Sequence, residues 1–567
     1  MAKRSLQQAA PAVSSKKPKL EKGDSSCCSE EKGKPERGKE RELQALAEEL
    51  QSLYTGNAVP AVKAAKVDEE KELLAGALLA SVPFLDLRTK KVRHEKLPFL
   101  LPHEWLSNYF LQPGAVQEAL PPKDSSLGQQ LQRVKEAWDN REPKEGREPE
   151  QGKPMVPLGL HGDGVPVQGR MNQSTADFIT VNLLASNTFA SMRVPITCVE
   201  SRFHAGSETA EAVHSVIAWS LQSLGEGIYP HCRHDGGSLD KARKQKAGKP
   251  MPARGGLVQL RGDWDWNCKW FGCPQWNEKN GMCWLCKAKP EEWRGMSAED
   301  RKASSLNKAE FLECLERRGK HVSPLLMLPG VCNKTIKPDW MHVVDEGCAA
   351  HAAGMVLQEL LRFTPDRGVD SKARRLWEEI QSLYKAKAVP ASRRLSKLTA
   401  KDICKPGKAP QLAAKAAECR YFCQDILLDL VDSKGLHMLG PHERAVHNVA
   451  RYLARMYGHM ENFDSKKLQK YGEKFISQYM ALEAEALHEE DNLTWHSKPK
   501  IHFLGHILDE AREGMRPKDS WNYRDETEGY QFQKLWFRRG GRTTKAEKVL
   551  LKWAHEQPFL SLKEAQK

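Results

Sequence analysis

The chain has 567 residues and a formal net charge of +14, with a pI near 9.0. This length exceeds what one hydrophobic core serves, so we expect roughly two to four folded units. The sequence shows no N-terminal apolar stretch and no long apolar span, which argues against secretion and membrane insertion. Its 14 cysteines include a Cys-x-x-Cys pair and are expected to be reduced. The basic excess favours a polyanionic partner, most simply a nucleic acid.

The first 155 residues predict a tail, a helical region and a linker. Residues 1–45 are rich in Lys, Glu, Ser and Gly, so they cannot offset the entropy of ordering and are expected to be disordered. Within this tail, SSKKPKLEK is either a nuclear import signal or a solvated charge run, and it is the basis for expecting a nuclear protein. Residues 46–140 are expected to form a helical N-terminal region, because apolar residues recur at three and four over residues 43–54 and 69–79. Residues 141–155 are charged and rich in Pro and Gly, as linkers are.

Four apolar stretches predict strands, and a helix separates the last two. The strands are expected near residues 156–162, 176–184, 192–200 and 256–263. The helix is expected over 207–224, with Ser207 or Thr209 as its N-cap. Three strands, a helix and a strand open a ribonuclease H-like domain, in which the first and fourth strands are neighbours. We therefore predict an α/β fold with a ribonuclease H-like mixed sheet flanked by helices.

The rest of the chain divides by its periodicity. Residues 156–344 are expected to form the first part of the core, including a cysteine-rich knot. Residues 345–495 are helical in pattern throughout and predict a large all-helical insertion. Residues 496–545 then return to the core, and residues 546–567 form a C-terminal tail.

Two predicted strands end in a Gly-Asp pair, Asp163 in LHGDG and Asp263 in LRGDW. If the strands are neighbours, these carboxylates meet, although Asp163 can also serve only its Gly-Asp-Gly turn. Further on, Asp339 lies one helical turn before His342. N-capping by Asp339 and packing or capping by His342 are the alternatives to a functional role.

Four cysteines follow Asp263 at a C-x4-C-x9-C-x2-C spacing, which suits one tetrahedral Zn²⁺. They are Cys268, Cys273, Cys283 and Cys286. The alternative is four reduced cysteines packed among the neighbouring tryptophans. If only the Cys-x-x-Cys half binds, other residues must complete the site. The next candidate ligands are His342, Cys348 and His351.

The order of motifs resembles a known family. LHGDGVP, LRGDWDW with CWLC, PDWMHVVDEG, and KPKIHFLGH with WNYRDETEG follow one another between about residues 155 and 545. This order resembles DDE transposases of the CACTA and hAT-like superfamilies, and in particular a transposon-derived group of algal proteins. The resemblance implies that Asp163, Asp263 and Glu526 are the three catalytic acids. Asp265 and Asp339 are rivals for the second position, and Asp525 and Glu528 are rivals for the third. The resemblance makes Asp339 and His342 the Asp-x-x-His signature found between the second and third acids.

The resemblance also implies a chemistry and a partner. Three acids that hold two Mg²⁺ or Mn²⁺ ions suit the cleavage and transfer of DNA strands. DNA is the expected partner, a homo-oligomer is possible in this family, and no terminal-repeat-binding zinc finger is visible at the N-terminus. The basic residues expected to hold DNA are Lys241, Arg243, Lys244, Lys246, Lys249, Arg538, Arg539 and Arg542. Two other interpretations stay open: an inactive transposon-derived DNA-binding protein, and a zinc-dependent interaction protein.

Overall fold

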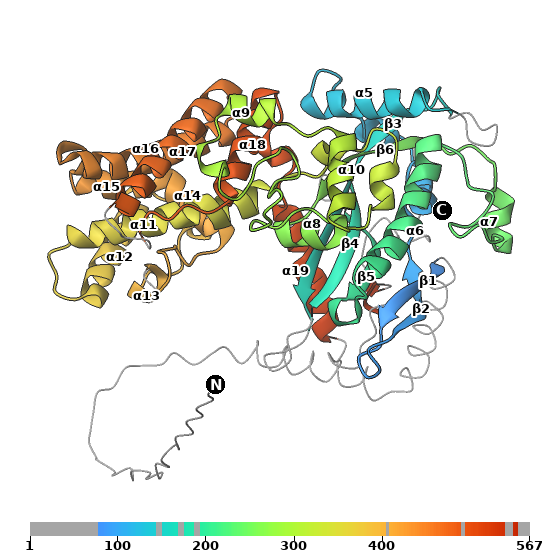
Figure 1. The fold of residues 1–567 in the computed structure, drawn as a ribbon, viewed down its shortest axis with the longest axis horizontal. Helices are drawn as coiled ribbons and strands as arrows, with labels where there is room; N and C mark the ends of the chain where they lie inside the picture. The colour runs from blue at the N-terminus through green and yellow to red at the C-terminus, as the bar shows by residue number, and fades with distance from the viewer. Residues whose placement is uncertain are drawn as a thin grey trace, which may run out of the picture. The chain divides into compact units, whose positions relative to one another are not determined.

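A mixed sheet of four strands organises the described fold (Figure 1). The strand order is β5-β4-β3-β6, in which β3 pairs antiparallel with β4 and parallel with β6. The strands are β3 (Met155–Pro166), β4 (Thr175–Leu183), β5 (Arg193–Glu200) and β6 (Arg254–Arg261). They overlap the four predicted strands, and β3 continues past its predicted end. The predicted α/β class and mixed sheet are confirmed.

The computed structural model describes most of the chain from residue 77 onward. The described ranges are 77–142, 150–167, 175–185, 193–403, 407–488, 494–538, 548–550 and 552–553. The predicted tail of residues 1–45, with its import-like segment, lies outside the described residues. Arg539 and Arg542 lie outside them as well.

The sheet is buried because helices cover both of its faces. Neighbouring residues of a strand point to opposite faces, and Gly255 lies against Leu224 of α6 (Ser207–Glu226) whereas Gly256 lies against Val134 of α5 (Ser126–Asp139). The helix α19 (Tyr523–Arg538) shares the face of α5, since Asp525 contacts Asn182 on the side opposite α6. A sheet covered on both faces explains why β5 and β6 are buried at every position.

A β-hairpin stands in a region for which the sequence predicted helices. Strand β1 (Leu78–Leu85) pairs antiparallel with β2 (Val92–Phe99). Asp86 turns the chain by accepting backbone N–H bonds from Arg88 and Thr89. The predicted helix over residues 69–79 is therefore wrong at its described end, because Leu78 and Leu79 belong to β1, along which burial alternates with a period of two from Leu78 to Val82. Helices follow the hairpin: α3 (Pro102–Tyr109), α4 (Ala115–Glu118) and α5.

The helix α6 begins at residue 207 as predicted, but its N-cap is not one of the two predicted residues. Gly206 occupies the N-cap position, and neither Ser207 nor Thr209 caps the helix. The Thr209 hydroxyl instead donates to the carbonyl of Pro83 at 2.6 Å and accepts from the N–H of Ala205 at 2.8 Å. Thr209 therefore joins α6 to the end of β1.

Short helices connect β6 to the helical block. They are α8 (Trp264–Phe271), α9 (Ala298–Ala303) and α10 (Lys308–Arg317), and α7 (Lys241–Lys246) precedes β6. Single 3₁₀ turns occur at η1 (Ser201–Phe203), η2 (Trp293–Gly295), η3 (Pro324–Met327), η4 (Asn333–Thr335), η6 (Ala391–Arg393), η7 (Leu436–Met438) and η8 (Pro517–Asp519).

The described residues between 345 and 488 contain helices and no strand (Figure 1). A π-helical segment, η5 (Met341–Cys348), leads into this block. The helices are α11 (Ala349–Arg362), α12 (Val369–Ala386), α13 (Ala400–Ile403), α14 (Ala416–Asp425), α15 (Leu427–Ser433), α16 (Pro441–Glu461) and α17 (Ser465–His488). The chain then returns through α18 (Lys500–Arg512) to α19. None of the described helices is both long enough and apolar enough to cross a membrane.

Candidate functional site

The two Gly-Asp pairs lie at the same end of neighbouring parallel strands. His161 of β3 is in register with Arg261 of β6, and Asp163 and Asp263 each follow two residues later. A Cβ atom on Gly162 would lie 1.7 Å from the Trp266 ring, and one on Gly262 would lie 2.3 Å from it. Only glycine fits at both positions, because the Trp266 indole packs directly on the two backbones. The Gly-Asp repeat is therefore a packing requirement that also brings the two carboxylates to one edge.

Backbone hydrogen bonds hold both carboxylates in place. Asp263 is the N-cap of α8 and accepts the N–H of Trp266 at 2.6 Å, and Asp163 accepts the N–H of Gly164 at 2.7 Å. Both side chains are partly exposed. Burial raises the pKa of Asp163 to about 6, and the negative charge of Asp263 contributes to the same shift. Asp163 therefore forms a hydrogen bond within its Gly-Asp-Gly turn and also interacts with the charge of Asp263.

Glu526 joins this pair from the first turn of α19. Burial raises the pKa of Glu526 to about 8, and the charge of Asp163 is the next cause. The helix comes close to the sheet at Gly529, where a Cβ atom would lie 3.0 Å from Phe178 and 3.1 Å from Val165. The structure therefore brings Asp163, Asp263 and Glu526 near enough for their charges to interact. Among the described residues, however, the ligand oxygens of these three acids do not all lie within 4.8 Å of one another.

The rivals for the third position have other partners. Asp525 is fully buried and forms 2.8 Å ion pairs with Arg193 and with Arg261. Burial alone would raise the pKa of Asp525, but the two guanidinium charges hold it well below its usual range. Glu528 accepts a hydrogen bond from the indole of Trp553. Of the three neighbouring acids, Glu526 is the one whose pKa is raised by the charge of Asp163.

Replacing Asp525 by Asn should therefore destabilise the fold. The substitution leaves two buried guanidinium groups without their counter-charge, a loss of about 3–5 kcal/mol in comparable buried pairs. Glu528→Gln on the same helix is the comparison. A Gln side chain can still accept the hydrogen bond from Trp553, so this change should lower the free energy of unfolding by less than about 1 kcal/mol. Urea unfolding of the two variants measures the difference, and equal stabilities would contradict a structural role for Asp525.

Asp339 and His342 form the next part of the site. The carboxylate of Asp339 accepts the backbone N–H groups of Met341 at 3.2 Å and His342 at 3.0 Å, so it caps the turn as its alternative interpretation predicted. It also lies 2.7 Å from His342 Nδ1 and accepts the N–H of Asn522 at 2.9 Å. The hydrogen bond from Asn522 fixes the start of α19, which begins at the next residue. Capping, imidazole orientation and attachment of the third acid's helix thus depend on one buried carboxylate.

His342 directs its other ring nitrogen at the acids. His342 Nε2 lies 3.8 Å from Glu526 Oε1. Burial works against the charged imidazolium, but the hydrogen bond and charge of Asp339, followed by the charges of Glu526 and Asp263, raise the pKa of His342 to about 9. The raised pKa keeps His342 as an imidazolium at neutral pH, and its charge compensates part of the repulsion between Asp163 and Asp263.

The raised pKa of Glu526 predicts a pH-dependent stability. Since the folded state holds a proton on Glu526 up to about pH 8 and the unfolded chain loses it near pH 4.5, wild-type stability should fall as pH rises through that interval. Glu526→Gln replaces the titrating carboxyl by an amide that stays neutral at every pH, so the variant should become the more stable protein at pH 8, by on the order of 1 kcal/mol after allowance for solvent screening. Denaturant titrations at pH 5 and pH 8 measure the effect, and parallel pH profiles of the two proteins would contradict it.

A second cluster lies apart from the carboxylates and consists of two cysteines and two histidines. Cys283, Cys286, His502 and His506 are all buried, and their ligand atoms all lie within 4.8 Å of one another. Cys286 Sγ is 3.3 Å from His502 Nε2, and Cys283 Sγ is 3.4 Å from His506 Nε2. A hydrogen bond from the Cys283 thiol, together with the two imidazoles, lowers the pKa of Cys286 and favours its thiolate. A buried Cys₂His₂ set of this kind could hold a metal such as zinc.

Local geometry brings these four side chains together. The histidines are four residues apart and therefore share one face of α18. The backbone N–H of Leu285 donates to Cys283 Sγ at 3.3 Å, which shapes the turn between the two cysteines. Beside them, the Phe503 ring stacks on Trp284 at 4.4 Å between ring centres. The cluster thus fastens α18 to the loop that follows α8.

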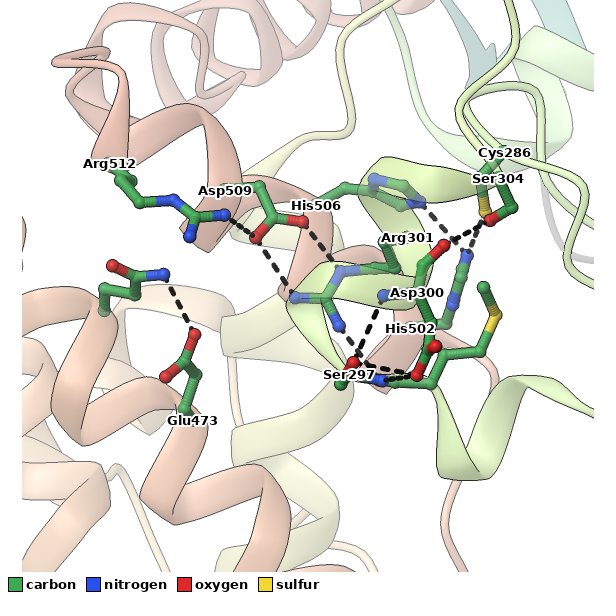
Figure 2. A network of polar contacts seen from close by, with 12 residues as sticks. Cys286, Ser297, Asp300, Arg301, Ser304, Glu473, His502, His506, Asp509 and Arg512 are labelled. Carbon is green, nitrogen blue, oxygen red and sulfur yellow. Dashed lines mark hydrogen bonds and ion pairs between the residues drawn. The ribbon is translucent and has the colours of Figure 1, made fainter.

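Helix α9 holds α18 next to this cluster (Figure 2). Arg301 lies over Gly505, where a Cβ atom would be 2.6 Å from the guanidinium carbon, and it pairs with Asp509 at 2.7 Å. At the other end of the helix, Lys500 donates to the carbonyl of His342 at 2.7 Å. Helix α18 therefore contacts both the metal-ligand cluster and the carboxylate site.

The four-cysteine ligand set predicted from the sequence is wrong in two members. Cys268 and Cys273 do not join the cluster. Burial raises the pKa of both, to about 12 for Cys268, and keeps them as thiols. The reserve candidates are placed elsewhere too: His342 lies among the acids, Cys348 is a buried thiol whose pKa is raised to about 12, and the ring of His351 faces the carbonyl of Pro410. The available signal was the H-x3-H spacing in KIHFLGH, which completes a Cys₂His₂ set with the Cys-x-x-Cys pair.

The basic residues predicted to hold DNA have mixed surroundings. Arg243 pairs with Glu104 and with Asp240, both at 2.6 Å, so its charge is already compensated. Lys246 lies 5.5 Å from the centre of the Tyr229 ring. The remaining members of this cluster, Lys241, Lys244 and Lys249, are exposed, as is Arg538 at the end of α19.

Comparisons with known proteins assign no family to the chain. No model of a known protein family matches the sequence, and no curated protein matches it either.

Proposed function

We propose that this protein cleaves and transfers DNA strands in a divalent-metal-dependent reaction, as the DDE transposases that it resembles do. The convergence of Asp163, Asp263 and Glu526 carries the proposal. Burial, together with the charge of a neighbouring acid, raises the pKa of Asp163 and of Glu526, so ionising this partly buried group of acids is costly without a cation, which is typical of a functional site. Two acids on neighbouring strands and a third from a distant helix also match the expectation from the motif order.

The sheet supports a ribonuclease H-like assignment. In the strand order, the first strand of the sheet, β3, lies between the second, β4, and the strand that follows the first helix, β6. An isolated parallel bridge between Leu260 and Ile336 places a further extended segment beside β6. This segment leads directly to Asp339, so the Asp-x-x-His signature begins where a fifth strand would end. The pairing of β3 with β6 accords with the neighbouring first and fourth strands expected of a ribonuclease H-like fold.

The chain's own residues can divide the work of the reaction. Asp163 and Asp263 present oxygen ligands from fixed strand ends, and Glu526 would complete the ligand set from α19. Mg²⁺ or Mn²⁺ bound there would activate the attacking oxygen and stabilise the leaving oxygen. The His342 imidazolium, oriented by Asp339, would attract the phosphate of the strand to be cut. A DNA substrate also accords with the nuclear location expected from the N-terminal segment.

A nicking assay on supercoiled DNA tests the proposal. The intact protein should convert supercoiled plasmid to the nicked form with Mg²⁺ or Mn²⁺ and should not do so with EDTA. Binding of duplex DNA without any cleavage at either metal would favour an inactive transposon-derived DNA-binding protein. A protein that neither binds nor cuts DNA would favour a zinc-dependent interaction protein.

A further inference from the structure

Helices α16 and α17 pack against each other and carry a basic and aromatic face that the carboxylate site does not use. We call it the α16–α17 face, and it consists of Arg451, Tyr452 and Arg455 on α16 and Lys470, Tyr471 and Lys474 on α17. The two tyrosine rings stack with 6.4 Å between their centres and an angle of 27°. The face therefore lies across the seam between the two helices.

The tyrosines hold the cations of this face in position. Arg451 donates to the Tyr452 hydroxyl at 3.2 Å, and Arg455 donates to the Tyr471 hydroxyl at 3.1 Å. The ammonium groups also lie by the rings, Lys474 at 5.5 Å from the centre of Tyr452 and Lys470 at 5.9 Å from that of Tyr471. Contacts of this kind order long side chains that would otherwise lose much entropy on binding a ligand.

The positive charge of the face is not compensated within the described chain. No carboxylate of the described residues lies within the 4.0 Å ion-pair distance of Arg451, Arg455, Lys470 or Lys474, although several exposed cations elsewhere have such partners. The neighbouring exposed acid Glu473 accepts its 2.9 Å hydrogen bond from the amide of Gln469 (Figure 2). Four ordered cations without counter-charges form a site for a polyanion.

We propose that the α16–α17 face binds the phosphate backbone of duplex DNA away from the carboxylate site. The proposal rests on the proposed function only in the choice of DNA as the polyanion. Cations and the His459 ring, stacked on Tyr471 at 5.4 Å, already lie against the tyrosine rings, so these rings are poorly placed to stack on the bases of single-stranded DNA. Guanidinium and ammonium groups spread over two helices instead suit successive phosphates, which give affinity without sequence selection.

Salt-dependent binding tests this inference. Fluorescence anisotropy would measure the affinity of the full chain for a labelled duplex over a series of KCl concentrations. Arg455→Gln with Lys470→Gln and Lys474→Gln should weaken binding about tenfold or more and lower the slope of log affinity against log salt by roughly 2 to 3. The matched control removes three exposed charges from α12 and α13 by Arg374→Gln, Lys385→Gln and Lys401→Gln and should bind like the wild type. If the triple variant of the face fails to fold, Lys474→Glu alone provides the test, since this side chain is exposed.

Each outcome decides the inference. An unchanged salt slope for the face variant, or an equal loss of duplex affinity in the control variant, would overturn the inference. So would a greater loss of affinity for single-stranded than for duplex DNA, or a loss of polyglutamate binding without a loss of duplex binding. If the intact protein does not nick DNA but the face variant loses duplex affinity, the proposed function fails and this inference stands. If the intact protein nicks DNA and the face variant keeps its affinity, this inference fails and the proposed function stands.

Discussion

Glu526→Gln should reduce metal-dependent cleavage of DNA by about a thousandfold or more while duplex affinity stays within about threefold of the wild type. The substitution keeps the size of the side chain and removes the negative charge that a bound cation requires, a loss typical of groups that act in the transition state. Asp163→Asn and Asp263→Asn should behave in the same way. Plasmid nicking and anisotropy on the same preparations measure the two quantities.

Neighbouring acids supply the controls for this experiment. Glu528 lies two residues further along α19, and Asp265 lies two residues beyond Asp263 and is exposed on α8. Glu528→Gln and Asp265→Asn should therefore retain most of the cleavage activity. Cleavage that survives Glu526→Gln but not Glu528→Gln would show that a different residue is the third acid.

Replacing Cys283 and Cys286 together by Ser should remove about one bound zinc per chain and unfold the region around α18. Structural zinc contributes directly to folding free energy, and in small zinc domains this contribution reaches roughly 10 kcal/mol or more. Because α18 leads into α19, cleavage should be lost as well. Elemental analysis, thermal unfolding and limited proteolysis would report the three effects.

The other cysteine pair provides a matched control. Cys268→Ser with Cys273→Ser changes one thiol on α8 and one shortly after it, both outside the Cys₂His₂ cluster, so the zinc content should stay at about one per chain. His506→Ala should lower it as the Cys283 and Cys286 replacements do. A zinc content that depends on Cys268 but not on His506 would show that the four cysteines are the ligands.

The sequence predicted those parts of the fold that depend on local pattern. The strands around Asp163 and Asp263 have short apolar runs and Gly-Asp ends, and both properties are visible within about ten residues. The hairpin formed by β1 and β2 was missed because apolar spacings compatible with a helix continue into residue 78 and propensity alone does not decide between the two.

The metal-ligand cluster shows why the remainder was hard to predict. Cys283 and His506 are 223 residues apart, and no local pattern states which distant pair will complete a tetrahedral set. The choice among Asp525, Glu526 and Glu528 had the same difficulty, since it depends on which face of α19 meets Arg193 and Arg261. That information is held in tertiary packing, not in spacing.

The attachment of α18 to His342 says how so large an insertion fits into the protein. Lys500 contacts the carbonyl of His342, 158 residues earlier, so the chain leaves the core and re-enters it at almost the same point. Closing a loop costs little more as it lengthens, about 0.6 kcal/mol for each doubling. The intervening helices can therefore differ in length or be replaced by others without displacing the strand ends that carry Asp163 and Asp263.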